Sequence, residues 1–175
     1  MSYILHPDYA DIVVIRGRSL LSRMIEKLTG FVSHVGIVTV PFKWPWDSLV
    51  TQALTTVQDV SLYETVIGTD GAYLLHAKNL TDDQRLHVAM WARTQLGVAY
   101  DYKDIGYQFL DNTFHTEWFT QKYASPKKFI CSELVAKAYA TIELDFGVPA
   151  RSATPEEIYV FALNNADKYD ITKLM

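Results

Sequence analysis

The sequence predicts an α+β fold in a single domain, and three observations support this prediction. The chain has 175 residues, a length typical of one domain. Hydrophobic residues make up 49% and charged residues 21%, which is enough apolar material for a core. Short β-rich runs fill the first half, whereas helical periodicity and capping motifs dominate the second. We therefore expect residues 1–175 to form one domain, with a sheet packed against helices.

The first half is expected to contribute most of the strands. Apolar and β-branched runs predict strands over 11–15, 35–40, 49–54, 57–63 and 72–76. An early helix is predicted over 19–28, because apolar residues recur there at helical spacing and Gly30 fits a C-terminal cap. Residues 41–47, with two prolines and two tryptophans, are expected to form a loop.

The second half is expected to be mostly helical. Thr81-Asp82-Asp83-Gln84 fits a capping box and predicts a helix to about Leu96, closed by Gly97. Thr154-Pro155-Glu156-Glu157 fits a second box, opening a helix to about Leu163. Further helices are expected over 131–142 and near 104–110, and an irregular aromatic segment over 114–128.

Composition excludes several classes of protein. The net charge is −4 without a dense basic cluster, so a nucleic-acid partner is not expected. The single cysteine excludes an intramolecular disulfide and multi-cysteine metal sites, and no H-E-x-x-H motif occurs, so we expect neither metal nor cofactor. No apolar stretch reaches the roughly 20 residues of a membrane span, and the N-terminus lacks signal-peptide features. A cytoplasmic location without stable membrane insertion is expected, and later release by lysis or in a particle is compatible with it.

Cys131 is the first candidate for chemistry. It opens an apolar helix, where the partial positive charge of the helix N-terminus stabilises a thiolate. Free backbone N–H groups at this position can also bind a developing oxyanion. The alternative, a small buried core residue, stays open on position alone.

A catalytic cysteine needs an imidazole close in space, and His34 is the best placed of five histidines. It stands at the start of a predicted strand, and Gly36 leaves the same strand face open. His76, at the end of another strand, is the fallback base. His87 is expected on the surface, and His6 and His115 fall in irregular segments.

A third group usually orients the base. Gln52 can do so if its strand pairs with that of His34, although an ordinary polar residue on a half-exposed strand fits the spacing equally well. The competing carboxylates are Asp11, Glu64 and Asp101.

Six segments of the chain resemble a known group of enzymes. Residues 11–17, 19–22 and 33–37 resemble the opening of the circularly permuted NlpC-like hydrolases (the YiiX/YaeF group), and residues 95–102 and 130–135 resemble its second half, with Thr154-Pro155 near the end. The histidine precedes the cysteine in this group, as it does here, whereas ordinary papain-like enzymes have the reverse order.

The resemblance implies a permuted papain-like fold, in which a small antiparallel sheet packs against the helix that carries the nucleophile. It implies Cys131 as nucleophile, His34 as base, and Gln52 at a third position where many relatives carry Glu. Ala10 stands where relatives often have Gly. The substrate-binding positions would be Tyr100, Tyr102, Ser33 and Ser132.

The expected function is therefore a cysteine hydrolase, an amidase or peptidase that forms a thioester on Cys131. Peptidoglycan-type peptides and other amides are candidate substrates. Two alternatives remain: an acyltransferase or lipid-ester hydrolase like lecithin–retinol acyltransferase, which the aromatic segment 114–128 would suit, and a catalytically silent binding or virion-associated module. The sequence leaves the substrate and the oligomeric state open.

Overall fold

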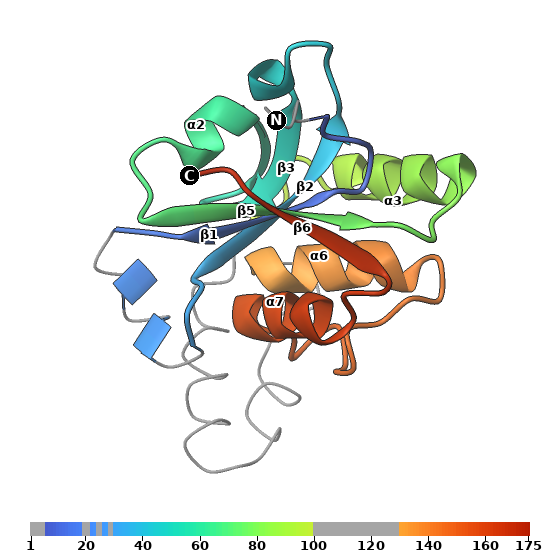
Figure 1. Ribbon diagram of the computed structural model, residues 1–175. Helices are drawn as coiled ribbons and strands as arrows, with labels where there is room; N and C mark the ends of the chain where they lie inside the picture. Colours follow the sequence, from blue (N-terminus) through green and yellow to red (C-terminus); the bar gives the residue numbers. More distant parts are fainter. Residues whose placement is uncertain (1–5, 19–21, 24–25, 28–29, 100–129) are drawn as a thin grey trace.

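A six-stranded antiparallel sheet forms the centre of the protein (Figure 1). The computed structural model describes residues 6–18, 22–23, 26–27, 30–99 and 130–175. The strands lie in the order β4-β3-β2-β1-β5-β6. Their bounds are β1 Ile12–Arg16, β2 His34–Val40, β3 Leu49–Ala53, β4 Val57–Ser61, β5 Gly71–Ala77 and β6 Tyr169–Lys173. The helices are η1 Pro45–Asp47, α2 Leu62–Val66, α3 Asp82–Thr94, α6 Cys131–Ala140 and α7 Pro155–Asn164.

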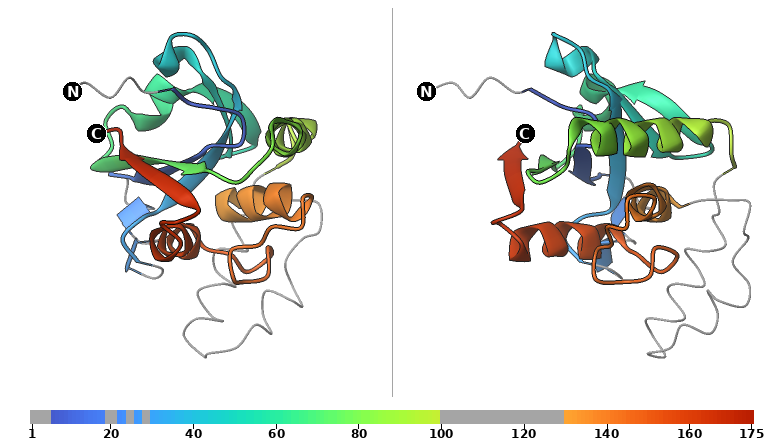
Figure 2. Two further views of the ribbon diagram at one scale, coloured as in Figure 1. Left: turned by 45° about the vertical axis from the view of Figure 1, so that its right-hand side comes forward. Right: turned by 90° about the vertical axis from the view of Figure 1, so that its right-hand side faces the viewer.

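Helices cover the two faces of the sheet unequally (Figures 1 and 2). Alternate residues of the central strands, such as Ile12 and Ile37, form the main core with buried residues of α3, α6 and α7. Their neighbours, such as Val13 and Val38, form a smaller core against Leu62 and Val66 of α2. Among the described residues, no helix is long and apolar enough to cross a membrane. The molecule is thus an α+β structure with its larger core under α6.

The sequence located most of the strands to within one residue, but two elements differ from the prediction. The strand predicted over 57–63 ends at Ser61, because Ser61 caps helix α2 and accepts a hydrogen bond from the Glu64 N–H at 3.1 Å. Strand β6 was not predicted at all; it pairs with β5 along its whole length.

Both predicted capping boxes are present. Thr81 accepts from the Gln84 N–H at 3.2 Å, and Thr154 accepts from the Glu157 N–H at 3.2 Å. Helix α3 ends at Thr94 and α6 at Ala140, each two residues before its predicted end. This difference reflects terminal residues that continue as turns.

Two predicted helices and the aromatic segment fall wholly or partly outside the described residues. Of the helix predicted over 19–28, residues 22–23 and 26–27 are described and are helical. Gly30 follows it with a φ of 137°, and its N–H bonds to the Glu26 carbonyl at 3.0 Å. The predicted helix near 104–110 and the segment 114–128 lie outside the described residues.

A buried arginine joins α3 to the start of β1 and the end of β5. The guanidinium of Arg85 lies 3.6 Å from the Asp11 carboxylate and donates to the carbonyls of Tyr9 and Ala77. It also donates to His76 Nε2 at 3.1 Å, so the Nδ1–H of His76 donates to Asp11 at 2.8 Å. Asp11 is fully buried, and its carboxylate is stabilised by hydrogen bonds from His76 and from the Asp8 N–H at 2.9 Å and by the charge of Arg85.

Replacing Arg85 by leucine should lower the free energy of unfolding by roughly 3 kcal/mol, because it leaves the Asp11 carboxylate buried without a cation. Urea unfolding followed by tryptophan fluorescence measures this change. Arg93→Leu, in the same helix, is the matched control. Arg93 forms a more exposed ion pair with Asp59 at 3.2 Å, and we expect a loss below about 1 kcal/mol there. Equal losses in the two variants would contradict a special role for Arg85.

Candidate active site

Cys131 is the first residue of α6, a helix of which most residues are buried. Its N-cap, Ile130, has no side chain that could bond to the free N–H groups of the first turn. The sulfur instead accepts hydrogen bonds from the backbone N–H groups of Val35 and Ser132. The Cys131 side chain is therefore held where strand β2 meets the positive end of the helix dipole.

His34 is the first residue of β2 and forms a hydrogen bond with the Cys131 side chain. Its Nε2 lies 2.6 Å from Gln52 Oε1 on the neighbouring strand β3. Because Nε2 is occupied by Gln52, the nitrogen left to face the thiol is Nδ1. The three residues form one hydrogen-bonded chain from sulfur to imidazole to amide.

The two titrating groups of this chain shift each other's pKa in opposite directions. Burial raises the pKa of the Cys131 thiol, but the charge of His34, its hydrogen bond and two backbone donors outweigh burial and lower it. Burial lowers the pKa of His34, but the Cys131 charge and the hydrogen bonds to Cys131 and Gln52 outweigh it and raise it. Each group therefore favours the charged form of the other, a thiolate beside an imidazolium.

Gly36 allows β3 to come close enough for Gln52 to reach His34. Strands β2 and β3 pair Ile37 with Thr51, and the same register sets Gly36 opposite Gln52. A Cβ atom on Gly36 would lie 2.6 Å from Val50 Cγ1 and 3.1 Å from Gln52 Cβ. The open strand face predicted at Gly36 is thus the space that the β3 side chains fill.

A further polar residue, Thr65 of α2, completes the surroundings of Gln52. Gln52 Nε2 donates to Thr65 Oγ1 at 3.3 Å, and that hydroxyl donates to the Ser61 carbonyl at 2.8 Å. Thr65 was not among the residues predicted for the site, because the start of α2 was predicted to be part of a strand. The signal was present: Ser61 and Glu64 have the spacing of a capping box.

The other candidate bases and orienting groups lie elsewhere. Both ring nitrogens of His76 have partners, Asp11 and Arg85, so neither Asp11 nor His76 serves the thiol. Glu64 accepts from the Ser61 hydroxyl at the exposed start of α2. His6 and His87 are exposed, as expected for His87. Asp101 and His115 lie outside the described residues.

The four expected substrate-binding residues have different surroundings. Ser33 is buried, and its hydroxyl accepts from the Gly17 N–H at 3.0 Å and donates to the Ile15 carbonyl at 3.5 Å. Ser132 is fully buried, and its hydroxyl has no hydrogen-bond partner among the described residues. Tyr100 and Tyr102 lie outside the described residues. Ser33 is thus a structural link between β1 and β2.

The residue Ala10, noted as a departure from the resembling group, has a left-handed backbone with a φ of 65°. Only glycine adopts this conformation without a steric penalty, which accounts for a glycine in relatives. In this chain the Ala10 carbonyl accepts from the Tyr139 hydroxyl of α6, a contact that ties the turn to the main core.

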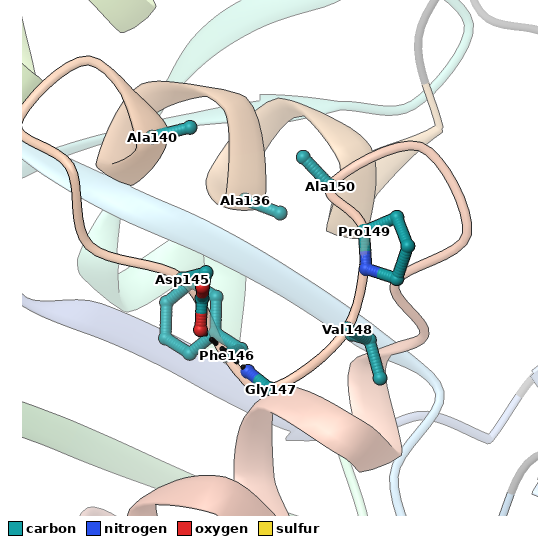
Figure 3. A pocket seen from close by; sticks show the side chains of 8 residues that line it. All are labelled: Ala136, Ala140, Asp145, Phe146, Gly147, Val148, Pro149 and Ala150. Atoms are coloured by element: carbon teal, nitrogen blue, oxygen red, sulfur yellow. Dashed lines mark hydrogen bonds between the residues drawn. The ribbon is translucent and has the colours of Figure 1, made fainter.

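A cavity of about 420 Å³ lies between α6 and the loop 145–150 (Figure 3). Its described lining consists of Ala136 and Ala140 of α6 and the loop 145–150. Neither Cys131 nor His34 is part of this lining. The cavity is therefore separate from the cysteine–histidine pair.

Comparison with known proteins finds one solved structure of interest. No protein-family model matches the chain, and no curated protein matches it. A crystal structure of the metalloprotein yiiX from Escherichia coli O157:H7, DUF1105, matches it with a TM-score of 0.66. The match covers 98% of each chain at 18% sequence identity. The chain thus has the fold of yiiX, which supports the resemblance to the YiiX group at the level of the fold.

Proposed function

We propose that the protein is a cysteine hydrolase with a permuted papain-like fold, in which Cys131 is the nucleophile and His34 the base. The observation that carries this proposal is the hydrogen-bonded chain from Cys131 through His34 to Gln52, with the thiol at the start of a buried helix. Nucleophile, base and orienting group in this order are the arrangement that activates a thiol.

The proposed reaction is acyl transfer to water. The Cys131 thiolate attacks an amide or ester carbonyl, and the N–H groups at the start of α6 stabilise the negative oxygen. The imidazolium of His34 then gives its proton to the leaving amine or alcohol, and a thioester remains on Cys131. Neutral His34 takes a proton from water as that water attacks the thioester, which releases the acid and the free thiol.

Amides are the leading substrate class, with peptidoglycan-type peptides among them. An acyltransferase or lipid-ester hydrolase would use the same thioester but a different acceptor or acyl group. The aromatic segment that would suit such a substrate lies outside the described residues. A binding module without turnover would need neither a low thiol pKa nor an oriented imidazole, and these two features favour an enzyme over a silent module.

The fold neighbour yiiX is a metalloprotein, which raises the question of whether this site could hold a metal. Cys131 Sγ and His34 Nδ1 can act as ligands, but His34 Nε2 is bonded to Gln52. Within the described part of the chain, no three histidine, cysteine, aspartate or glutamate side chains are grouped so that they could hold a metal ion. A protein-bound zinc usually has three or four such ligands, so the described residues do not fit a metal centre.

The pH dependence of Cys131 alkylation by iodoacetamide tests the proposed dyad. In the wild-type protein we expect alkylation to persist well below the ordinary thiol pKa of roughly 8.5, because His34 lowers the pKa of Cys131. In His34→Ala the thiol is still buried but has lost its counter-charge, so its pKa should rise. Alkylation should then require a pH above roughly 8.5. The measurement is the second-order rate constant as a function of pH.

His87→Ala provides the matched control, because His87 is exposed and its loss should leave the profile unchanged. An ordinary wild-type profile that does not respond to His34→Ala would contradict the dyad.

If the dyad is present, a screen of peptide amides and acyl esters follows, in which Cys131→Ala must abolish turnover. Turnover that survives in Cys131→Ala would assign the activity to another site.

Gly36→Ala should disturb the same dyad from the neighbouring strand. The added methyl group displaces Val50 and Gln52, so we expect unfolding to become easier by about 1–3 kcal/mol and alkylation to shift toward higher pH. Gly71→Ala is the matched control, since a Cβ there meets nothing closer than 3.8 Å. Urea unfolding and the alkylation profile measure both effects. An unaltered profile in Gly36→Ala would show that His34 does not depend on the spacing of these strands.

A further inference from the structure

We propose that Thr65 is a positioning residue that fixes the amide orientation of Gln52 and thereby the nitrogen on which His34 carries its proton. The inference rests on the proposed function, because the orientation matters only if His34 acts on Cys131. It extends the site from three residues to four and brings helix α2 into it.

The hydrogen-bond directions around Thr65 follow from its single proton. The Thr65 hydroxyl donates that proton to the Ser61 carbonyl at 2.8 Å. Toward Gln52 it can therefore only accept, and the group it faces at 3.3 Å must be the donating Nε2. The two ends of the amide are thus distinguished, and Oε1 is directed at His34.

The orientation of the amide decides what His34 can do. With Oε1 at 2.6 Å, the Nε2 of His34 carries a proton and donates it, which leaves Nδ1 of the neutral ring free to accept the thiol proton. A rotated amide would present an N–H group to Nε2. The neutral ring would then carry its proton on Nδ1, facing Cys131, and the imidazolium would face a second donor. The first form cannot accept the thiol proton, and the second is destabilised by the donor that faces it, so both disfavour the thiolate–imidazolium pair.

Burial of Gln52 and Thr65 makes the rotated orientation of the Gln52 amide unfavourable. Gln52 is 3% exposed and Thr65 is 8% exposed, so solvent offers the amide little compensation for a lost partner. Thr65 itself is held in place, since Ser61 both caps α2 and accepts the Thr65 proton. The position of the Thr65 hydroxyl therefore follows from the start of the helix.

The need for Thr65 arises from the amide at position 52. A glutamate has two equivalent oxygens and accepts from His34 in either orientation. Thr65 should therefore matter for reactivity when residue 52 is Gln and much less when it is Glu. A purely structural role for Thr65 would show no such dependence.

Five proteins test the inference: the wild type, Thr65→Val, Thr65→Ser, Gln52→Glu and the double variant that combines Thr65→Val with Gln52→Glu. The readout is the pH profile of Cys131 alkylation. Thr65→Val in the wild-type background should raise the midpoint by roughly half to one pH unit, the effect of one ordinary hydrogen bond. The same change in the Gln52→Glu background should shift the midpoint much less. Thr65→Ser, which keeps the hydroxyl, should retain the wild-type profile.

Two results would overturn the inference while leaving the dyad intact: a wild-type profile in Thr65→Val, or equal shifts in the two backgrounds. An ordinary thiol profile in the wild type would instead overturn the dyad and the inference together. Near-ultraviolet circular dichroism checks that each variant folds. Should Thr65→Val not fold, proton exchange of the Gln52 side-chain amide in the wild type decides, because the inference requires slow exchange and fast exchange would refute it.

Discussion

The docking of helix α6 on strand β2 is the interaction on which the rest of the site depends. Leu134, Val135 and Tyr139 of α6 are buried in one cluster with Val35 and Ile37 of β2. Burial of each large apolar side chain contributes about 1.5–3 kcal/mol, so this interface also holds much of the fold together. It brings the sulfur of the first helical residue to the backbone of the strand, where a ladder residue, Val35, supplies one of its donors.

The residue bonded to His34 Nε2, Gln52, is uncharged, and this has two effects. A carboxylate at position 52 would raise the pKa of His34 further by its charge, whereas the Gln52 amide does so only by a hydrogen bond. The amide avoids burying another negative charge near the thiolate. It also introduces an ambiguity that a carboxylate lacks, since its two ends have opposite hydrogen-bonding character. Two features of the structure accompany the amide at position 52. Gly36 lets Gln52 approach His34, and the Thr65 hydroxyl distinguishes the two ends of the amide.

Local signals in the sequence were sufficient to predict the strands near the centre of the sheet and two capped helices. Alternation and capping depend on residues that are close together in the sequence. The pairing of Cys131 with His34 was inferred from a resemblance and from residue type, since the two lie in different halves of the chain. Thr65 was missed because α2 has only five residues and follows a strand without a break. Strand β6 depends on pairing with β5, a long-range contact that its short sequence does not specify.

The separation of Cys131 and His34 along the chain makes the lone thiol a reporter of folding. In an unfolded or partly folded chain, Cys131 has no counter-charge and remains protonated at mildly acidic pH. The thiolate forms only when the α6 region has joined the β2 region, because both of its backbone donors and its imidazole must be in place. Pulsed alkylation during refolding at such a pH therefore records the completion of tertiary structure, independently of when the helices themselves appear.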